Sequence, residues 1–265
     1  MTANAPRTFA RYVALGDSST EGLEDPDGHG GYRGWANRLA EKVAAAQGSL
    51  LYANLAVRGR TAGEIRAQQL APALAMKPDL ATLFAGTNDA VRSGFDAAAV
   101  REDVEVMQRA LVAQGATVLT FTLADPAPLL PRPMARRIAL RVQALNEVLR
   151  EAAAASGALL VDFALWPVAS DPRLWNEDRL HANADGHARI AEALAERLGL
   201  AEANADWRAP LPSLPSPGVA ARLAADLAWV RRHFGPWVAR HLRGRSSGDG
   251  RSAKRPQLAP VELPR

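Results

Sequence analysis

Short apolar segments alternate with longer helical segments from residue 9 to residue 198, and this alternation constrains the fold more than any other feature of the sequence. The apolar segments are rich in Val, Leu and Phe on both faces, which is typical of strands buried between two layers of helices. We expect strands at 9–15, 50–55, 80–84, 116–123 and 159–163. We expect helices at 33–47, 62–76, 97–114, 134–156 and 184–198.

Strands that alternate with helices are joined by right-handed crossovers, and such crossovers produce a parallel sheet. The sequence therefore predicts an α/β fold with about five parallel strands. Ligands of open sheets of this kind bind beyond the carboxyl ends of the strands, where the strand order reverses. Residues directly after each strand are thus the first candidates for a functional site.

The last quarter of the chain has a different composition. Residues 204–265 contain 11 Lys and Arg against 4 Asp and Glu, whereas residues 1–203 contain 21 and 24. The Pro/Ser-rich stretch at 210–218 is typical of an extended linker, and the apolar residues of 219–237 share one helical face. We predict a globular domain at 1–203, a Pro-rich linker with a basic amphipathic helix at 204–243, and a disordered basic tail at 244–265.

The basic helix has several possible partners. Trp and Leu residues beside arginines fit a helix at a membrane surface, so peripheral membrane contact stays open. Pro236 interrupts the helical pattern, which favours docking on the body of the protein or on a second subunit. Nucleic acid is not the expected partner, because only this end of the chain is basic.

Several classes of protein are excluded or disfavoured by composition. The chain has no cysteine, which excludes a thiol nucleophile, a disulfide framework and a Cys-ligated metal site. No window approaches 18 uninterrupted apolar residues, and no apolar segment of signal-peptide length precedes the first strand. We therefore expect a cytoplasmic protein.

Four short motifs follow predicted strands or precede the last helix. Ser18 follows the first strand, Gly59 the second and Asn88 the third, and Asp178 and His181 precede the helix at 184–198. Each has an ordinary interpretation alone, as a turn residue, a loop glycine, a helix cap or a surface pair. Together they supply a nucleophile, a base with an orienting acid, and hydrogen-bond donors for an oxyanion.

These motifs are GDSSTEG at 16–22, NLAVRGRT at 54–61, GTND at 86–89 and DRLH at 178–181. In order and spacing they resemble the four blocks of the SGNH hydrolases, the superfamily of GDSL-type esterases and lipases, over about residues 10–200. The resemblance implies a three-layer α/β/α flavodoxin-like sandwich and a serine hydrolase of carboxylic esters that needs no metal or organic cofactor. Ala182 is a small departure, because many members have proline after the histidine.

The resemblance also implies a role for each motif residue. Ser18 is the implied nucleophile, His181 the base and Asp178 its orienting partner. The backbone N–H groups of Ser18 and Gly59 and the side-chain amide of Asn88 are the implied oxyanion donors. The expected substrate is a small-molecule ester.

Three other functions remain open. Hydroxyls and amides of Ser18, Ser19 and Thr20 could wrap the phosphate of FMN or another ligand, although this leaves Asn88 unexplained. A catalytically silent binding protein could act through the basic tail, and an alcohol could replace water as acyl acceptor in a transferase.

Some further residues carry narrower expectations. The apolar, proline-rich loop at 125–133 is expected to line the acyl pocket. Arg58 and Arg60 either contact an acidic substrate group or are solvated. His187 is expected to be structural, because Asp185 alone gives it an incomplete set of metal ligands.

Overall fold

The computed structural model describes residues 8–215 and 217–263 of the chain. The predicted domain at 1–203 includes Met1–Arg7, and the predicted tail at 244–265 includes Pro264 and Arg265. The predicted linker includes Ser216. These parts of the predictions lie outside the described residues.

A mostly parallel sheet forms the centre of the fold. Its strand order is β5-β4-β3-β1-β2-β6, and the first five strands of the chain are mutually parallel. They are β1 (Arg11–Gly16), β2 (Leu51–Asn54), β3 (Leu80–Phe84), β4 (Thr117–Phe121) and β5 (Leu159–Val161). The strand order reverses between β1 and β3, so a ligand site is expected beyond the ends of these two strands.

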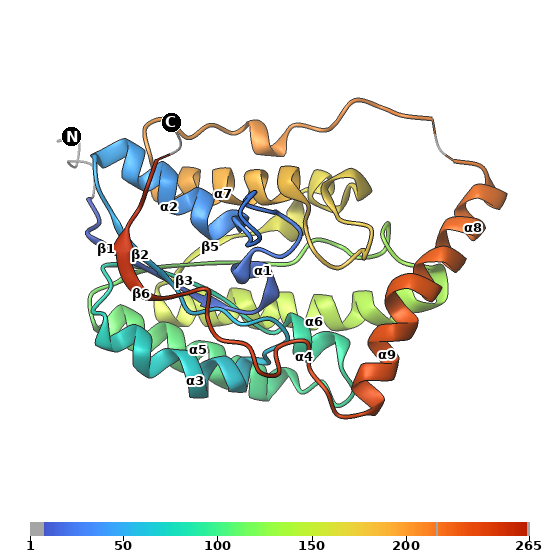
Figure 1. The fold of residues 1–265 in the computed structure, drawn as a ribbon, viewed down its shortest axis with the longest axis horizontal. Helices are drawn as coiled ribbons and strands as arrows, with labels where there is room; N and C mark the ends of the chain where they lie inside the picture. Colours follow the sequence, from blue (N-terminus) through green and yellow to red (C-terminus); the bar gives the residue numbers. More distant parts are fainter. Residues whose placement is uncertain (1–7, 216, 264–265) are drawn as a thin grey trace.

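Helices cover both faces of the sheet (Figure 1). One layer contains α2 (Gly34–Gln47) and α7 (Ala184–Leu198), and the other contains α3 (Ala62–Ala75), α5 (Ala97–Ala113) and α6 (Arg132–Ser156). The predicted α/β sandwich is confirmed, and each of these helices begins and ends within two residues of its predicted bounds. Two short helices were not anticipated, α1 (Ser18–Glu21) and α4 (Thr87–Val91).

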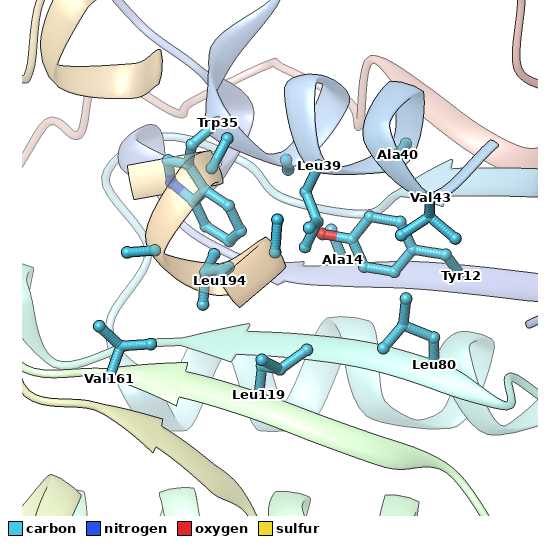
Figure 2. Close-up of a cluster of buried hydrophobic side chains, with 14 of the residues drawn as sticks. Tyr12, Ala14, Trp35, Leu39, Ala40, Val43, Leu80, Leu119, Val161 and Leu194 are labelled. Atoms are coloured by element: carbon cyan, nitrogen blue, oxygen red, sulfur yellow. The ribbon is translucent and has the colours of Figure 1, made fainter. Parts of the chain in front are cut away.

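Alternate residues of β1 enter two separate hydrophobic clusters. Tyr12 and Ala14 pack with Trp35 in the cluster under α2 and α7, which Figure 2 shows. Val13 and Leu15 belong to the cluster under α3, α5 and α6. All five side chains are 0% exposed. Burial on both faces explains why this strand reads as an uninterrupted apolar run.

Beyond α7 the chain forms a C-terminal extension that returns along the helical layer and crosses one end of the sheet (Figure 1). It contains η4 (Asp206–Arg208), α8 (Val219–Trp229), the π-helical turn η5 (Val230–Phe234) and α9 (Gly235–Leu242). The predicted amphipathic helix is therefore present as three consecutive helical segments. No helix in the described part of the chain is both long enough and apolar enough to cross a membrane.

The prediction of a disordered tail is wrong for its last described residues. Strand β6 (Arg255–Pro260) pairs antiparallel with β2 at the edge of the sheet. Edge strands expose unpaired backbone groups, and β6 satisfies those of β2. Arg255 adds a hydrogen bond from Nε to the Tyr52 carbonyl oxygen at 3.0 Å. Polar composition concealed this strand, because its order comes from pairing rather than from burial of its own side chains.

Candidate active site

Ser18 lies at the first position of α1, directly beyond the carboxyl end of β1. The turn into the helix requires glycine at position 16, since a Cβ there would lie 2.1 Å from Thr20 Oγ1 and 2.7 Å from the Phe84 carbonyl oxygen. Asp17 caps the helix by accepting a hydrogen bond from the Ser19 N–H at 3.1 Å. The hydroxyl of Ser18 is thereby presented at the edge of the sheet, where the strand order reverses.

His181 joins the serine to a carboxylate. Its Nε2 lies 2.8 Å from Ser18 Oγ, and its Nδ1 lies 2.6 Å from Asp178 Oδ2. The serine and the histidine are 163 residues apart in the sequence. The structure therefore brings together all three residues of the predicted triad in the arrangement that serine hydrolases use.

The loop that carries Asp178 and His181 is internally braced. Asp178 Oδ1 accepts hydrogen bonds from the backbone N–H groups of Leu180 and His181, both at 3.0 Å. Arg179 adopts the left-handed conformation with φ 60°, which is rare for a residue other than glycine. The carboxylate is held by its own loop while its second oxygen orients the imidazole.

Burial and charge act in opposite directions on the pKa values of this pair. Burial lowers the pKa of His181, but the hydrogen bond and negative charge of Asp178 outweigh it and raise the pKa above 6.5. Burial raises the pKa of Asp178, but its hydrogen bond to His181 and the charge of His181 bring it below 3.8. Asp178 is therefore ionised at neutral pH and stabilises a protonated imidazole.

The three predicted oxyanion donors line the same cavity as the serine and histidine. Gly59 has φ 76°, and a Cβ at this position would lie 2.4 Å from Ser246 Oγ in the C-terminal extension. Asn88 directs its Nδ2 to Asp17 Oδ2 at 2.9 Å and to the Arg60 carbonyl oxygen at 3.0 Å. Its amide thus already has two acceptors, and an oxyanion would share one of its hydrogens.

Asp17 is the second buried carboxylate of the site, and it was not anticipated. It is 1% exposed, and burial raises its pKa to about 6, against the hydrogen bond from the Ser19 N–H, the charge of His181 and the Asn88 amide. Its place between the nucleophile and Asn88 fixes the orientation of that amide. Only its position beside Ser18 in the sequence could have indicated this role.

A cavity of about 1110 Å³ opens from the triad. One wall comes from the proline-rich loop after β4 and from α6, as the sequence predicts for the loop at 125–133. Another part of the wall comes from the C-terminal extension, a contact that the sequence did not predict. The residues of that wall include Trp229, Phe234, Trp237 and Val238. The spacing of these residues on one helical face was the only feature of the sequence that could have indicated that this helix packs against the body of the protein.

Each arginine of the second motif forms an ion pair with a carboxylate of the protein, and Arg58 also lines the cavity. Arg58 forms an ion pair with Glu21, with 2.5 Å between Nη2 and Oε1, and its backbone N–H also donates to Glu21. Arg60 pairs with Glu64 at 3.1 Å. Both arginines brace the loop that presents Gly59.

His187 is buried within the fold. Its Nδ1 accepts a hydrogen bond from the Trp35 N–H at 3.1 Å, and its Nε2 donates to the Leu23 carbonyl oxygen at 2.9 Å. Burial lowers its pKa to about 4. Both nitrogens are thus used by the backbone, and the described residues contain no group of three His, Cys, Asp or Glu that could hold a metal ion.

Comparison with known proteins shows the family of the chain. The model of the GDSL-like lipase/acylhydrolase family matches residues 14–189. Comparison with curated proteins gives no match.

Three solved structures illustrate the likeness of the fold. TesA is 24% identical, with a TM-score of 0.59 over 71% of this chain and 97% of its own. The lipase/acylhydrolase from Enterococcus faecalis is 23% identical, with a TM-score of 0.58 over 74% and 98%. The acetylxylan esterase Axe2 from Geobacillus stearothermophilus is 17% identical, with a TM-score of 0.57 over 76% and 100%. At these identities the likeness establishes a shared fold, and the family match ends before α8 begins.

Proposed function

The chain belongs to the GDSL-like lipase/acylhydrolase family and is a carboxylic-ester hydrolase, and we propose that it cleaves small-molecule esters through a covalent acyl-enzyme on Ser18. The observation that carries this proposal is the position of His181, 2.8 Å from Ser18 Oγ on one side and 2.6 Å from Asp178 Oδ2 on the other. A base between a hydroxyl and a carboxylate is the arrangement that activates a serine.

In the first half of the reaction, Ser18 Oγ attacks the ester carbonyl carbon while His181 Nε2 takes the hydroxyl proton. The carbonyl electron pair moves onto oxygen, and the oxyanion is stabilised by the N–H groups of Ser18 and Gly59 and by the Asn88 amide. The C–O bond to the alcohol then breaks, His181 returns the proton to the leaving oxygen, and the acyl group remains on Ser18.

In the second half, water takes the place of the departed alcohol. His181 accepts a proton from this water as its oxygen attacks the acyl carbon, and the same donors stabilise the second oxyanion. The bond to Ser18 Oγ breaks, the serine regains its proton from His181, and the carboxylic acid leaves. Asp178 stabilises the imidazolium that forms in each half.

Two structural relatives support these roles. For the acetylxylan esterase Axe2, catalytic mutants are known in which a serine or a histidine is replaced by alanine. The esterase EstA from Pseudoalteromonas sp. is inhibited by monoethylphosphonate. A phosphonate of this kind is therefore a suitable probe for the proposed nucleophile.

The test compares wild type and Ser18→Ala on p-nitrophenyl esters from acetate to dodecanoate. We expect wild type to be active and to lose activity after treatment with a p-nitrophenyl ethyl phosphonate, because Ser18 Oγ bonds to phosphorus as p-nitrophenolate leaves, and mass spectrometry should locate the phosphonyl group on Ser18. Ser18→Ala should be inactive and unlabelled while remaining folded by circular dichroism. Equal activity of the two proteins, or a label on another residue, would contradict the proposal.

We further propose that α8 contacts an anionic lipid surface. Val219, Leu223 and Leu227 form a stripe on α8 that is 64–76% exposed. Arg222, Arg231 and Arg232 are exposed beside it, and a basic helix with an apolar stripe is suited to such a surface.

The protein should sediment with phosphatidylglycerol vesicles and not with phosphatidylcholine vesicles, and a Leu223→Glu/Leu227→Glu variant should stay in solution. Equal behaviour of that variant and wild type would contradict this contact.

The division of the chain into a hydrolase domain at 1–203 and a separate C-terminal extension stays a prediction.

A further inference from the structure

Residues of the C-terminal extension line the cavity that contains Ser18 and His181. We propose that residues 229–242 complete a binding cavity for an extended apolar acyl group, so that the enzyme prefers esters of medium- and long-chain acids over acetate esters. This inference rests on the proposed ester hydrolysis at Ser18. It concerns a part of the chain that lies outside the family match at 14–189.

The wall of the cavity that belongs to the body of the protein is apolar and preformed. Leu129 and Val142 are 6% and 5% exposed, and Met134 and Ile138 line the cavity from the first turns of α6. The loop that leads into α6 is held by a hydrogen bond from the Leu129 N–H to the Pro126 carbonyl oxygen at 3.0 Å. These residues present a fixed apolar surface that continues from the serine.

The wall that belongs to the extension contains three aromatic rings beside Arg232 and Arg240. Trp229 stacks on Phe234 with ring centroids 5.5 Å apart, and Phe234 stacks on Trp237 at 6.0 Å. All three residues line the cavity. Aromatic rings offer a large rigid surface for an aliphatic chain at little cost in side-chain entropy.

This aromatic wall is anchored at the triad loop. Trp229 Nε1 donates to the Asp178 carbonyl oxygen at 2.8 Å, and the Arg179 guanidinium lies 5.2 Å from the centre of the Trp229 ring. Arg179 also pairs with Asp226 at 2.6 Å. The extension is therefore fastened where His181 and Ser18 meet the cavity, and the space between the two walls begins at the reacting atoms.

The size of the cavity separates a long acyl group from an acetyl group. Its volume of about 1110 Å³ is slightly larger than the usual range for pockets that hold drug-sized ligands, about 300–1,000 Å³. An acetyl group would leave most of this apolar space unfilled. Each additional methylene that moves from water to such walls increases binding about fourfold, so kcat/KM should rise with chain length until the cavity is filled.

The experiment changes one residue of each wall and compares them with a matched residue outside the cavity. Phe234→Ala alters the extension, Ile138→Ala alters the body, and Leu223→Ala removes an exposed apolar side chain of α8 that does not line the cavity. The substrates are p-nitrophenyl acetate, octanoate and dodecanoate, each below its micellar concentration and without lipid, so that membrane contact plays no part.

We expect wild type to prefer octanoate or dodecanoate over acetate by at least tenfold in kcat/KM. Phe234→Ala and Ile138→Ala should each lose at least fivefold on the longer esters and less than twofold on acetate. Leu223→Ala should match wild type on all three. A wild type that prefers acetate, or variants that lose activity equally on all chain lengths, would overturn the inference.

Binding without turnover gives a second measurement. Dodecanoate should quench the tryptophan fluorescence of Ser18→Ala saturably, and adding Phe234→Ala should weaken that binding at least fivefold. Absence of saturable binding to Ser18→Ala would overturn the inference. The two proposals fail differently: full activity of Ser18→Ala would contradict the proposed function, whereas Ser18-dependent cleavage of acetate alone would contradict only the long acyl site.

Discussion

The indole Nε1 of Trp229 donates a hydrogen bond to the backbone carbonyl oxygen of Asp178 at 2.8 Å, across 51 residues of sequence. Trp229 is the buried residue of α8, at 7% exposed. The bond connects the C-terminal extension to the residue whose carboxylate orients His181. The position of the extension and the geometry of the triad are therefore coupled.

Trp229→Phe tests this coupling, because phenylalanine keeps most of the ring packing and removes the donor. A buried carbonyl oxygen that loses its partner costs about 1–3 kcal/mol, and we expect kcat to fall at least fivefold as the triad loop relaxes. The pH at which activity falls on the acid side should move toward 6.5 as Asp178 leaves its position beside His181. Both are measured from pH profiles of kcat and kcat/KM on one ester.

A matched control distinguishes positioning from general destabilisation. Trp207→Phe also loses an indole hydrogen bond, from Nε1 to Glu196 Oε2 at 2.7 Å, but this bond does not reach the triad. It should lower the melting temperature and leave the pH profile in place. Identical pH profiles for wild type and Trp229→Phe would show that the bond is only structural.

The acid side of the activity profile should report His181. The base must be neutral to accept the Ser18 proton, and Asp178 raises the pKa of His181 above 6.5 although burial opposes it. Activity of wild type should therefore fall as the pH drops through a value above 6.5. In Asp178→Asn, His181 is still buried but no longer has the carboxylate charge that raises its pKa. The acid limb of the activity profile should therefore move to lower pH.

Asp178→Asn should also lose about 10⁴-fold in kcat, because the imidazole is then held in the wrong tautomer. Both effects are measured in one series of kcat/KM values from pH 5 to pH 9. An acid limb at the same pH in wild type and Asp178→Asn would contradict the assignment of Asp178 as the partner of His181.

The residues that meet at the site were predictable to the extent that the sheet places them. Alternating strands and helices put the ends of β1 and β3 at one edge, so Ser18 and Asn88 could be expected to lie close together. The spacing of Asp178 and His181 likewise predicted a contact within one loop. These inferences needed only local periodicity and the handedness of crossovers.

Other contacts depend on packing between distant segments and have no local signal. Trp229 reaches Asp178 only because the linker after α7 carries α8 across the end of the sheet. The pair of Arg58 with Glu21, and the pairing of β6 with β2, are of the same kind. Composition changes after residue 203, but this change could not tell what the extension would contact.

Asn88→Ala should lower kcat by about 100- to 1,000-fold with little change in KM, as for the loss of one oxyanion donor. Asn88→Asp is the matched variant, because it keeps the shape and replaces the donating amide by an acceptor. It should be at least as impaired as the alanine variant. Steady-state kinetics on one ester measures both, and full activity of the aspartate variant would show that the amide donates nothing to the oxyanion.

His187 should make the folded state less stable as the pH falls below 6.5. Burial lowers its pKa in the folded state to about 4, whereas the unfolded chain binds the proton at its ordinary pKa of about 6.5. Between these values only the unfolded state gains the proton, and the unfolding free energy should drop by up to about 3 kcal/mol from this group. The stabilisation is fully present above pH 6.5.

His187→Gln isolates this contribution, because glutamine can accept from the Trp35 N–H and donate to the Leu23 carbonyl oxygen without titrating. Asp17 has the opposite effect on the unfolding free energy between about pH 6 and pH 4, because its pKa in the folded state, about 6, lies above its ordinary value. Asp17 is present in both proteins, so its contribution cancels in their difference. The difference between wild type and variant in urea unfolding at pH 7, 6, 5 and 4 therefore reports His187 together with its electrostatic interaction with Asp25. The wild type should lose stability relative to the variant with each step, and parallel curves would mean that His187 titrates normally in the folded protein.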